Sequence, residues 1–309
     1  MGMTGTREQW CVAVEPGEAE TVRQDLLGRG ILDRTLRPRR DGGRILFPVL
    51  RAEGATGRAD FQPHPVAENL PRHELVGGIA IMQENDPEEA SRLLRARPGL
   101  HTVLYPESAV EGTYRTRRFI VLAGETTTRT RYTEYGMRFE IDLAVAYFSA
   151  RLANERQHIA GLLETGERVL DMFAGVGPFA VALAAHARVV YACDINPAAV
   201  HLMAENIMLN RRRNVVPVLA DAGHLAGVLP RAFDRIIMNL PVSAAGFLGS
   251  AARLCRDGGT IHFYVLQSET GEYLPLLRNM TGGRITEREV RSYSPAQHHA
   301  VYDVEMRNR

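Results

Sequence analysis

The feature that most constrains this chain is a glycine-rich turn after a short apolar run, at residues 169–179, VLDMFAGVGPF. The apolar residues predict a β-strand that ends at Asp171, and the alanine-rich residues after Pro178 predict a helix. Gly175 and Gly177 allow a close approach of the backbone to a ligand, because a Cβ would block it. Pro178 suits the first helical position, where its missing N–H has no consequence. The stretch therefore predicts a strand, a tight loop and a helix start around a nucleotide-like ligand.

A second apolar run, residues 189–193, ends in Asp194, nineteen residues after Gly175. An acid at the tip of the second strand is placed to bind ribose hydroxyls. The pattern suits a dinucleotide or S-adenosylmethionine, and Ala180 replaces the third glycine of the dinucleotide fingerprint, as its looser form allows. The spacing Asp-x-Phe-x-Gly-x-Gly resembles methyltransferase motif I, which favours S-adenosylmethionine over a nicotinamide or flavin cofactor.

The composition is that of an ordinary globular protein. The chain has 309 residues, 45% of them hydrophobic, and a net charge of +1. This length suggests two or three domains. No apolar run approaches the length of a membrane span, and the three cysteines are too far apart in sequence for a metal or disulfide framework. We therefore expect a cytoplasmic protein without membrane contact or a bound metal.

All 37 basic residues are arginines, which excludes a lysine Schiff base or a Walker lysine. Several arginines are clustered, at residues 34–44, 115–118, 129–131 and 211–213. Each cluster alone is as well explained by a solvated face. Together they are compatible with a surface that follows a phosphate backbone.

Changes in composition along the chain predict four parts. Residues 1–52 form a small N-terminal α/β domain, 53–67 a linker rich in Gly, Ala and Pro, 68–135 an intermediate α/β domain, and 136–309 the cofactor-binding domain. From residue 166 onward, seven predicted strands follow, with helices between the first five. This alternation predicts a doubly wound, mainly parallel sheet. The last two strands, near 285–290 and 300–306, have no long helix between them and predict an antiparallel edge hairpin.

Polar residues follow four successive strands of this predicted sheet, namely Asp171, Asp194, Asp221 and Asn239. A single Asp or Asn after a strand is most often a turn or helix cap. Four in succession are harder to explain in that way, because the carboxyl ends of parallel strands meet at one edge, where ligands bind. Asn239-Leu240-Pro241 stands at methyltransferase motif IV. There an Asn carbonyl can accept hydrogen bonds from a planar base, while Pro241 restricts the backbone.

With these residues in view, the chain resembles the archaeal and eukaryotic tRNA (guanine-37 N1)-methyltransferase family, Trm5. The resemblance covers nearly the whole chain. Its motifs lie at 112–115, 122–125, 147–156, 171–179, 194–197, 206–210 and 239–241, and the first 50 residues resemble the family's N-terminal domain. The segment 147–156 departs from the family pattern at Ala150, where the family has Pro. This position lies beside the functional residues, so the departure puts little in doubt.

The resemblance implies a class I methyltransferase fold with an antiparallel edge strand and two small N-terminal α/β domains. It implies methyl transfer from S-adenosylmethionine to N1 of guanosine 37 of tRNA. Because N1 carries a proton near neutral pH, a base must remove it, and the matching position is Glu155. Arg115 would hydrogen-bond O6 and offset its developing charge. Asn239 would hold the base edge, with Pro241 shaping the loop.

The resemblance also implies which residues hold the cofactor. Asp194 would bind the ribose, Asp221 the adenine amino group and Arg151 the carboxylate. The remaining expected contacts are Tyr147, Asp171, Phe173, Gly175, Gly177 and Asn239. The target base must leave its stack to reach the site. We expect tRNA as the partner and a monomer without a stable protein partner.

Other readings of the same residues remain open. By spacing alone, Arg151 and Glu155 are an i,i+4 pair on a helix surface. An aminocarboxypropyl transferase of wybutosine synthesis uses the same fold and cofactor, although its segment at 147–156 typically lacks the Arg-Leu-x-x-Glu-Arg arrangement. A bifunctional enzyme that also methylates a tricyclic intermediate, or a non-catalytic tRNA-binding protein, are further alternatives.

Overall fold

The computed structural model describes residues 6–63, 70–294 and 296–307, and the chain forms two compact units, residues 1–70 and 71–309. Unit 1 is an antiparallel sheet of order β2-β3-β1-β4 with one longer helix, α1 (Ala19–Gly28). Its strands are β1 (Arg7–Val14), β2 (Arg39–Asp41), β3 (Arg44–Val49) and β4 (Gly57–Phe61). Leu26 of α1 is buried with Phe47 and Val49 of β3, so unit 1 has an apolar core of its own.

Strand β4 shows that the predicted linker over residues 53–67 was wrong for part of its length. Residues 57–61 pair with β1 in register from Cys11↔Gly57 to Arg7↔Phe61. Phe61 is fully buried in a cluster that includes Cys11 and Leu36. The segment has too few apolar residues to be recognised as a strand, but the free edge of β1 supplies its hydrogen bonds. Residues 64–67 lie outside the described residues.

Unit 2 begins with a four-stranded sheet of order β5-β6-β7-β8. Its elements are β5 (His73–Val76), β6 (Ile79–Met82), α2 (Pro87–Ala96), β7 (Thr102–Pro106) and β8 (Phe119–Gly124). Helix α2 connects the parallel pair β6 and β7. The backbone N–H groups of Glu88 and Glu89 each donate to Asp86 Oδ1 over 3.0 Å. Asp86 therefore caps the start of this helix.

A two-stranded hairpin, β9 (Arg129–Glu134) and β10 (Met137–Asp142), follows this sheet. It contradicts the predicted domain boundary between residues 135 and 136, which would divide the hairpin. Glu134 forms a buried ion pair with Arg156. Asn206 accepts from the Glu140 N–H over 2.7 Å and donates to the Glu140 carbonyl over 3.1 Å. The hairpin therefore belongs with the cofactor-binding part of unit 2.

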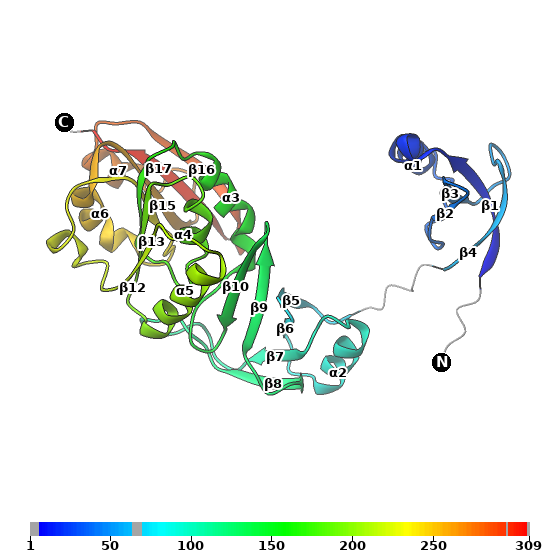
Figure 1. Cartoon of the computed structure of the whole chain (residues 1–309), viewed down its shortest axis with the longest axis horizontal. Coiled ribbons are helices and arrows are strands. Elements are labelled where there is room, and N and C mark those ends of the chain that lie inside the picture. Colours follow the sequence, from blue (N-terminus) through cyan, green and yellow to red (C-terminus); the bar gives the residue numbers. More distant parts are fainter. Residues whose placement is uncertain (1–5, 64–69, 295, 308–309) are drawn as a thin grey trace. The chain divides into compact units, whose positions relative to one another are not determined.

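The main sheet has seven strands in the order β13-β12-β11-β14-β15-β17-β16. The first five are parallel, whereas β17 runs antiparallel to both β15 and β16. These strands are β11 (Arg168–Asp171), β12 (Val189–Asp194), β13 (Val215–Leu219), β14 (Phe233–Met238), β15 (Cys255–Gln267), β16 (Ile285–Ser294) and β17 (Gln297–Glu305) (Figure 1). The predicted parallel sheet with an antiparallel edge hairpin is confirmed.

Helices cover both faces of this sheet, as a doubly wound fold requires. One face carries α3 (Ala153–Gly161), α4 (Pro178–Leu183) and α5 (Pro197–Leu209), and the other α6 (Leu248–Leu254) and α7 (Leu274–Met280). The sequence predicted a helix between β13 and β14, but the described residues of this segment form no α-helix. A 3-10 turn, Leu225–Gly227, stands there instead, because Gly223, Gly227 and Pro230 interrupt the segment. None of the described helices is both long and apolar enough to span a membrane.

Candidate active site

A cavity of about 610 Å³ lies at the carboxyl ends of the parallel strands of unit 2. That volume is in the range of small-molecule and cofactor sites. Its wall combines the ends of β11, β12, β13 and β14 with residues 110–117, which connect β7 and β8, and with the C-terminal hairpin. Nine residues predicted from the sequence line it: Arg115, Tyr147, Arg151, Phe173, Gly175, Asp194, Asp221, Asn239 and Pro241.

The glycine loop forms part of this wall through Gly175. Its backbone has φ +56°, and its N–H donates to Asp194 Oδ2 over 2.7 Å. A Cβ on Gly175 would stand 3.3 Å from the Tyr147 carbonyl oxygen, so a side chain there would crowd the loop. Gly177, at φ +85°, precedes α4 and is not part of the wall. Its missing Cβ instead makes room for Met203, whose Cγ would lie 2.8 Å away.

Two acids at strand ends reach the cavity as predicted. Asp194 also accepts from the Asn196 N–H over 2.9 Å, and burial raises the pKa of this carboxyl. Asp221 accepts from the Gly223 N–H over 2.8 Å and is more exposed. A carboxylate has about four acceptor directions, so both acids keep capacity for hydroxyl or amino donors of a ligand.

Asp171, in contrast, is not part of the cavity wall. It is 1% exposed, and its Oδ2 has no hydrogen-bond partner within the described chain. Burial raises the pKa of Asp171 to about 7, and the nearby charge of Asp194 acts in the same direction. The structure thus places this acid behind the loop.

The cavity wall also has groups suited to a planar polar ligand. Asn239 Oδ1 is buried, and no donor reaches it from the residues that the structure describes. The Arg115 guanidinium lies 5.7 Å from the centroid of the Tyr147 ring, and Arg115 has a left-handed backbone at φ +54°. Arg151 pairs with Glu74 of the small sheet at 2.8 Å. An unsatisfied acceptor and a nearby guanidinium offer complementary hydrogen bonds to a heterocycle.

Glu155, the predicted base, is held just behind this wall. It lies on α3, is 5% exposed and is not among the lining residues. The Tyr264 hydroxyl donates to its Oε1 over 2.6 Å, and Arg288 binds both carboxylate oxygens at 2.7 and 2.9 Å. The spacing suggested an exposed i,i+4 ion pair between Arg151 and Glu155. In the structure, Glu155 pairs with Arg288, and Arg151 pairs with Glu74.

The lining residues that the sequence analysis did not predict include Phe247, Arg291, Tyr293 and His299. Phe247 contacts the predicted residue Phe173 edge to face, with ring centroids 5.1 Å apart. His299 is 2% exposed, and its Nε2 finds no partner among the described residues. Burial and, to a lesser degree, the charge of Arg291 lower the pKa of His299 to about 4, so the ring is neutral at pH 7. The antiparallel pairing of the C-terminal hairpin brings Arg291, Tyr293 and His299 to the site, whereas Phe247 comes from the 3-10 turn before α6. No local motif in the sequence indicates these positions.

Comparison with known proteins assigns both units of the chain. The TRM5/TYW2 methyltransferase domain matches residues 130–280, and the tRNA methyltransferase 5 N-terminal domain matches residues 11–54. The first match begins within β9, in agreement with a hairpin that belongs to the cofactor-binding part.

Three relatives show how far the similarity extends. Trm5b of Pyrococcus abyssi, a tRNA (guanine(37)-N(1))-methyltransferase, is 37% identical over 94% of this chain and 97% of its own length. Its crystal structure covers 97% of this chain and 100% of the other, with a TM-score of 0.75. The structure of a complex of aTrm5 with tRNALeu is 26% identical, covers 96% and 99% of the two chains, and has a TM-score of 0.71.

A third relative, the tRNA(Phe) (4-demethylwyosine(37)-C(7)) aminocarboxypropyltransferase of Methanocaldococcus jannaschii, is 30% identical. Its match covers 75% of this chain and 96% of its own length. The Pyrococcus abyssi enzyme matches a larger share of the chain, and the N-terminal unit carries the Trm5 domain. On the fold, the strand-end cavity and these matches, the chain belongs to the Trm5 family of tRNA (guanine(37)-N(1))-methyltransferases.

Proposed function

We propose that this chain transfers a methyl group from S-adenosylmethionine to N1 of guanosine 37 of tRNA. The observation that carries the proposal is the cavity itself. It joins the strand-end acids Asp194 and Asp221 to two polar groups, Arg115 and Asn239, from distant parts of unit 2. A site with two halves, one for a nucleoside and one for a planar base, is what a base methyltransferase requires.

The residues present suit S-adenosylmethionine. The cavity has the volume that this cofactor needs, and Phe173 supplies an apolar part of its wall. Gly175 has no side chain that would block the approach of the cofactor to the loop. In this proposal Asp194 holds the ribose hydroxyls and Asp221 the adenine amino group. Arg151 and Tyr147 lie beside the methionine moiety, while Asp171 and Gly177 support the loop from behind. The cofactor supplies an electrophilic methyl group on a sulfonium.

The chain's own residues would then prepare the guanine. Asn239 Oδ1, which has no donor among the described residues, accepts from the base edge, and Pro241 restrains that loop. Arg115 donates to O6, where negative charge develops as N1 loses its proton. Glu155 takes the N1 proton while N1 forms its bond to the methyl carbon. Because Glu155 lies behind the wall, its side chain must turn toward the cavity for this step.

Glu155→Gln tests the base assignment. The amide keeps the shape but cannot take the proton, so we expect cofactor affinity within about twofold of the unmodified chain. Methyl transfer should fall by about a hundredfold or more, the usual contribution of a positioned base. Calorimetric titration of S-adenosylmethionine and a single-turnover assay on the same preparation measure both. Near-normal turnover of the variant would eliminate Glu155 as the base.

Arg115→Ala tests the other half of the site. Loss of a donor to the developing oxyanion should slow transfer by about a hundredfold with little change in cofactor affinity. The matched control is Arg118→Ala, since Arg118 is an exposed neighbour that pairs with Glu107 outside the cavity wall. A collapse of cofactor binding in the Arg115 variant would contradict the O6 role.

A second candidate function is aminocarboxypropyl transfer, because a relative of that activity matches three quarters of the chain. Unmodified tRNA incubated with cofactor labelled in the methyl or in the aminocarboxypropyl group distinguishes the two. We expect only the methyl label on the tRNA. A tRNA carrying the tricyclic wybutosine intermediate, offered in the same assay, tests a bifunctional enzyme.

The tRNA substrate further suggests a cytoplasmic enzyme that acts as a monomer. Sedimentation with and without tRNA measures the stoichiometry. A single chain per tRNA is the expected result.

A further inference from the structure

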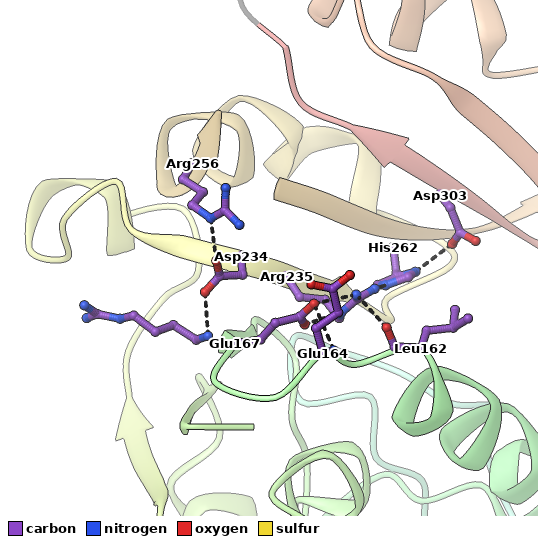
Figure 2. Close-up of polar contacts among 9 residues, drawn as sticks. Leu162, Glu164, Glu167, Asp234, Arg235, Arg256, His262 and Asp303 are labelled. Atoms are coloured by element: carbon purple, nitrogen blue, oxygen red, sulfur yellow. Dashed lines mark hydrogen bonds and ion pairs between the residues drawn. The ribbon is translucent and has the colours of Figure 1, made fainter. Parts of the chain in front are cut away.

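A continuous layer of polar side chains lies between α3 and the main sheet. Its first part runs across three strands and is shown in Figure 2. Arg235 of β14 donates to Glu167 over 2.7 and 2.9 Å and contacts His262 Nε2 of β15 at 2.7 Å. His262 Nδ1 lies 2.6 Å from Asp303 of β17. An arginine can only donate, so His262 Nε2 accepts and Nδ1 carries the proton that is donated to Asp303.

This chain of contacts fixes both the tautomer and the charge of the histidine. Burial lowers the pKa of His262, so the ring is neutral near pH 7. Burial alone would oppose ionisation of Asp303, but the hydrogen bond from His262 and the charge of Arg288 outweigh it and lower the pKa of that carboxyl. Asp303 is therefore a fixed negative charge beside Arg288.

The second part of the layer contains Glu155. The strand register places Tyr264, Val301 and Arg288 in one row across β15, β17 and β16. Tyr264 and Arg288 are the two residues of that row that bind Glu155. The hydrogen bond to Glu155 raises the pKa of Arg288, and the charges of Glu155 and Asp303 add to it. Arg288 thus lies between two carboxylates and stays positive.

The cavity begins one row further along the same face. Leu266 and His299 pair across β15 and β17, and both line the cavity. Two residues along a strand correspond to about 7 Å. The partners of Glu155 therefore lie about one row behind the wall, and His299 stands between them and the cavity.

We propose that Arg288 is a positioning residue that, with Tyr264, keeps Glu155 ionised behind the cavity wall, ready to receive the guanine proton. The inference rests on the proposed role of Glu155 as the base. A buried carboxylate without a cationic partner takes up a proton instead, and a protonated Glu155 cannot accept another. In this position three hydrogen bonds hold the carboxylate, which leaves about one acceptor direction unused.

The groups that control this ionisation come from several elements. Helix α4, which also packs against α3, contributes only apolar residues, so it adds no charge. The titratable side chains around Glu155 are Tyr264 and His262 of β15, Arg288 of β16, Asp303 and His299 of β17, and His158 of α3, which acts on Asp303. Both histidines of the sheet are buried with lowered pKa values, so Arg288 is the cation in contact with Glu155.

The test compares Arg288→Leu and Arg288→Lys in the full-length chain. The rate of single-turnover methyl transfer to a tRNA transcript is measured from pH 5 to pH 9. For Arg288→Leu we expect the acid limb of the profile to move to higher pH by about one unit, so that the loss of rate grows toward the acid end of the range, up to about tenfold, and disappears toward pH 9. The Lys variant should recover most of the loss, because it restores a positive charge.

Arg284→Leu is the matched control, since Arg284 is exposed and directly precedes the same strand. Its profile should superimpose on that of the unmodified chain. If Arg288→Leu leaves the profile unchanged, or lowers the rate by the same factor at every pH, the inference is wrong. If the Leu variant does not fold, Tyr264→Phe removes one hydrogen bond without changing shape, and its acid limb must move in the same direction by a smaller amount.

A second measurement does not depend on catalysis. Without Arg288, Glu155 holds a proton in the folded chain at a higher pH than in the unfolded chain. The loss of unfolding free energy caused by Arg288→Leu should therefore grow as the pH rises above about 4. In the Glu155→Gln background that growth should disappear, and its persistence would overturn the inference. If Glu155→Gln alone keeps full turnover, Glu155 is not the base. The unfolding measurement would still show whether Arg288 keeps Glu155 ionised.

Discussion

Asp171 shows how burial alone changes the chemistry of one residue. It ends β11 and is fully buried, with one oxygen unpaired among the residues that the structure describes. Burial raises its pKa to about 7, whereas the usual value is 3.8. The unfolded chain therefore releases this proton at a lower pH than the folded chain does. The raised pKa therefore stabilises the folded chain at pH values below the usual pKa. This contribution to the free energy of unfolding is lost as the pH rises to about 7.

This linkage predicts the pH dependence of stability. A shift of about three units corresponds to roughly 4 kcal/mol of unfolding free energy lost between about pH 4 and pH 7. Asp171→Asn cannot titrate, so its unfolding free energy should decline less over this range than that of the unmodified chain. Urea denaturation of the cofactor-free protein at four pH values measures the difference. Parallel curves for the two proteins would show that Asp171 does not titrate as inferred.

Helix α5 bonds to both the β9–β10 hairpin and the glycine loop through one buried amide, that of Asn206. Asn206 is fully buried and contacts two elements at once. It bonds the N–H and carbonyl of Glu140 in β10, and it donates to the Val176 carbonyl in the glycine loop over 3.0 Å. The position of the hairpin and the shape of the loop are therefore set by the same side chain.

Asn206→Ala should destabilise unit 2 by about 3 kcal/mol, because it leaves buried backbone groups without partners. Asn210 is the matched control on the same helix end. It makes comparable bonds to the backbone of Arg138, but these are partly exposed and water can replace them. Asn210→Ala should lose about 1 kcal/mol or less. Thermal unfolding monitored by circular dichroism compares the two, and equal losses would contradict the bridging role of Asn206.

At the scale of the whole molecule, the chain separates into a unit with its own small core and a unit that contains the entire cavity. Every lining residue lies at position 74 or later. Unit 1 ends at residue 70, before the first of these lining residues. Any contribution of unit 1 to tRNA recognition must come through its surface, which includes the exposed arginines Arg34, Arg37 and Arg40.

Removal of residues 1–70 should therefore leave cofactor affinity within about twofold of the full chain. Affinity for tRNA should fall, and the dependence of tRNA binding on salt should become less steep, because fewer phosphates are contacted. Titration calorimetry with S-adenosylmethionine and filter binding at several salt concentrations measure both. A truncated chain that lost cofactor binding would show that unit 1 supports the cavity after all.

Local patterns in the sequence were sufficient for the main sheet, the glycine loop and the strand-end residues. Each rests on neighbours in the chain: an apolar run, a turn residue and a capping side chain. Asp194, Asp221 and Asn239 reach the cavity for this reason, because parallel strands bring their ends together whatever the rest of the fold does. Local patterns failed where a segment has few apolar residues of its own and forms a strand through hydrogen bonds to a neighbouring strand. This is the case for β4, which was predicted as a linker. They also failed at the β9–β10 hairpin, which the predicted domain boundary at residue 135 would divide.

Only the tertiary structure decided the surroundings of Glu155. Tyr264 and Arg288 are 109 and 133 residues away in sequence and meet it through the register of β15, β17 and β16. The sequence by itself determined the fold class and the cofactor edge, since strand periodicity and turn chemistry act over a few residues. The tertiary structure decided which acids are buried, which arginine balances them and how Glu155 is held, because burial and charge pairing depend on residues that only folding brings together.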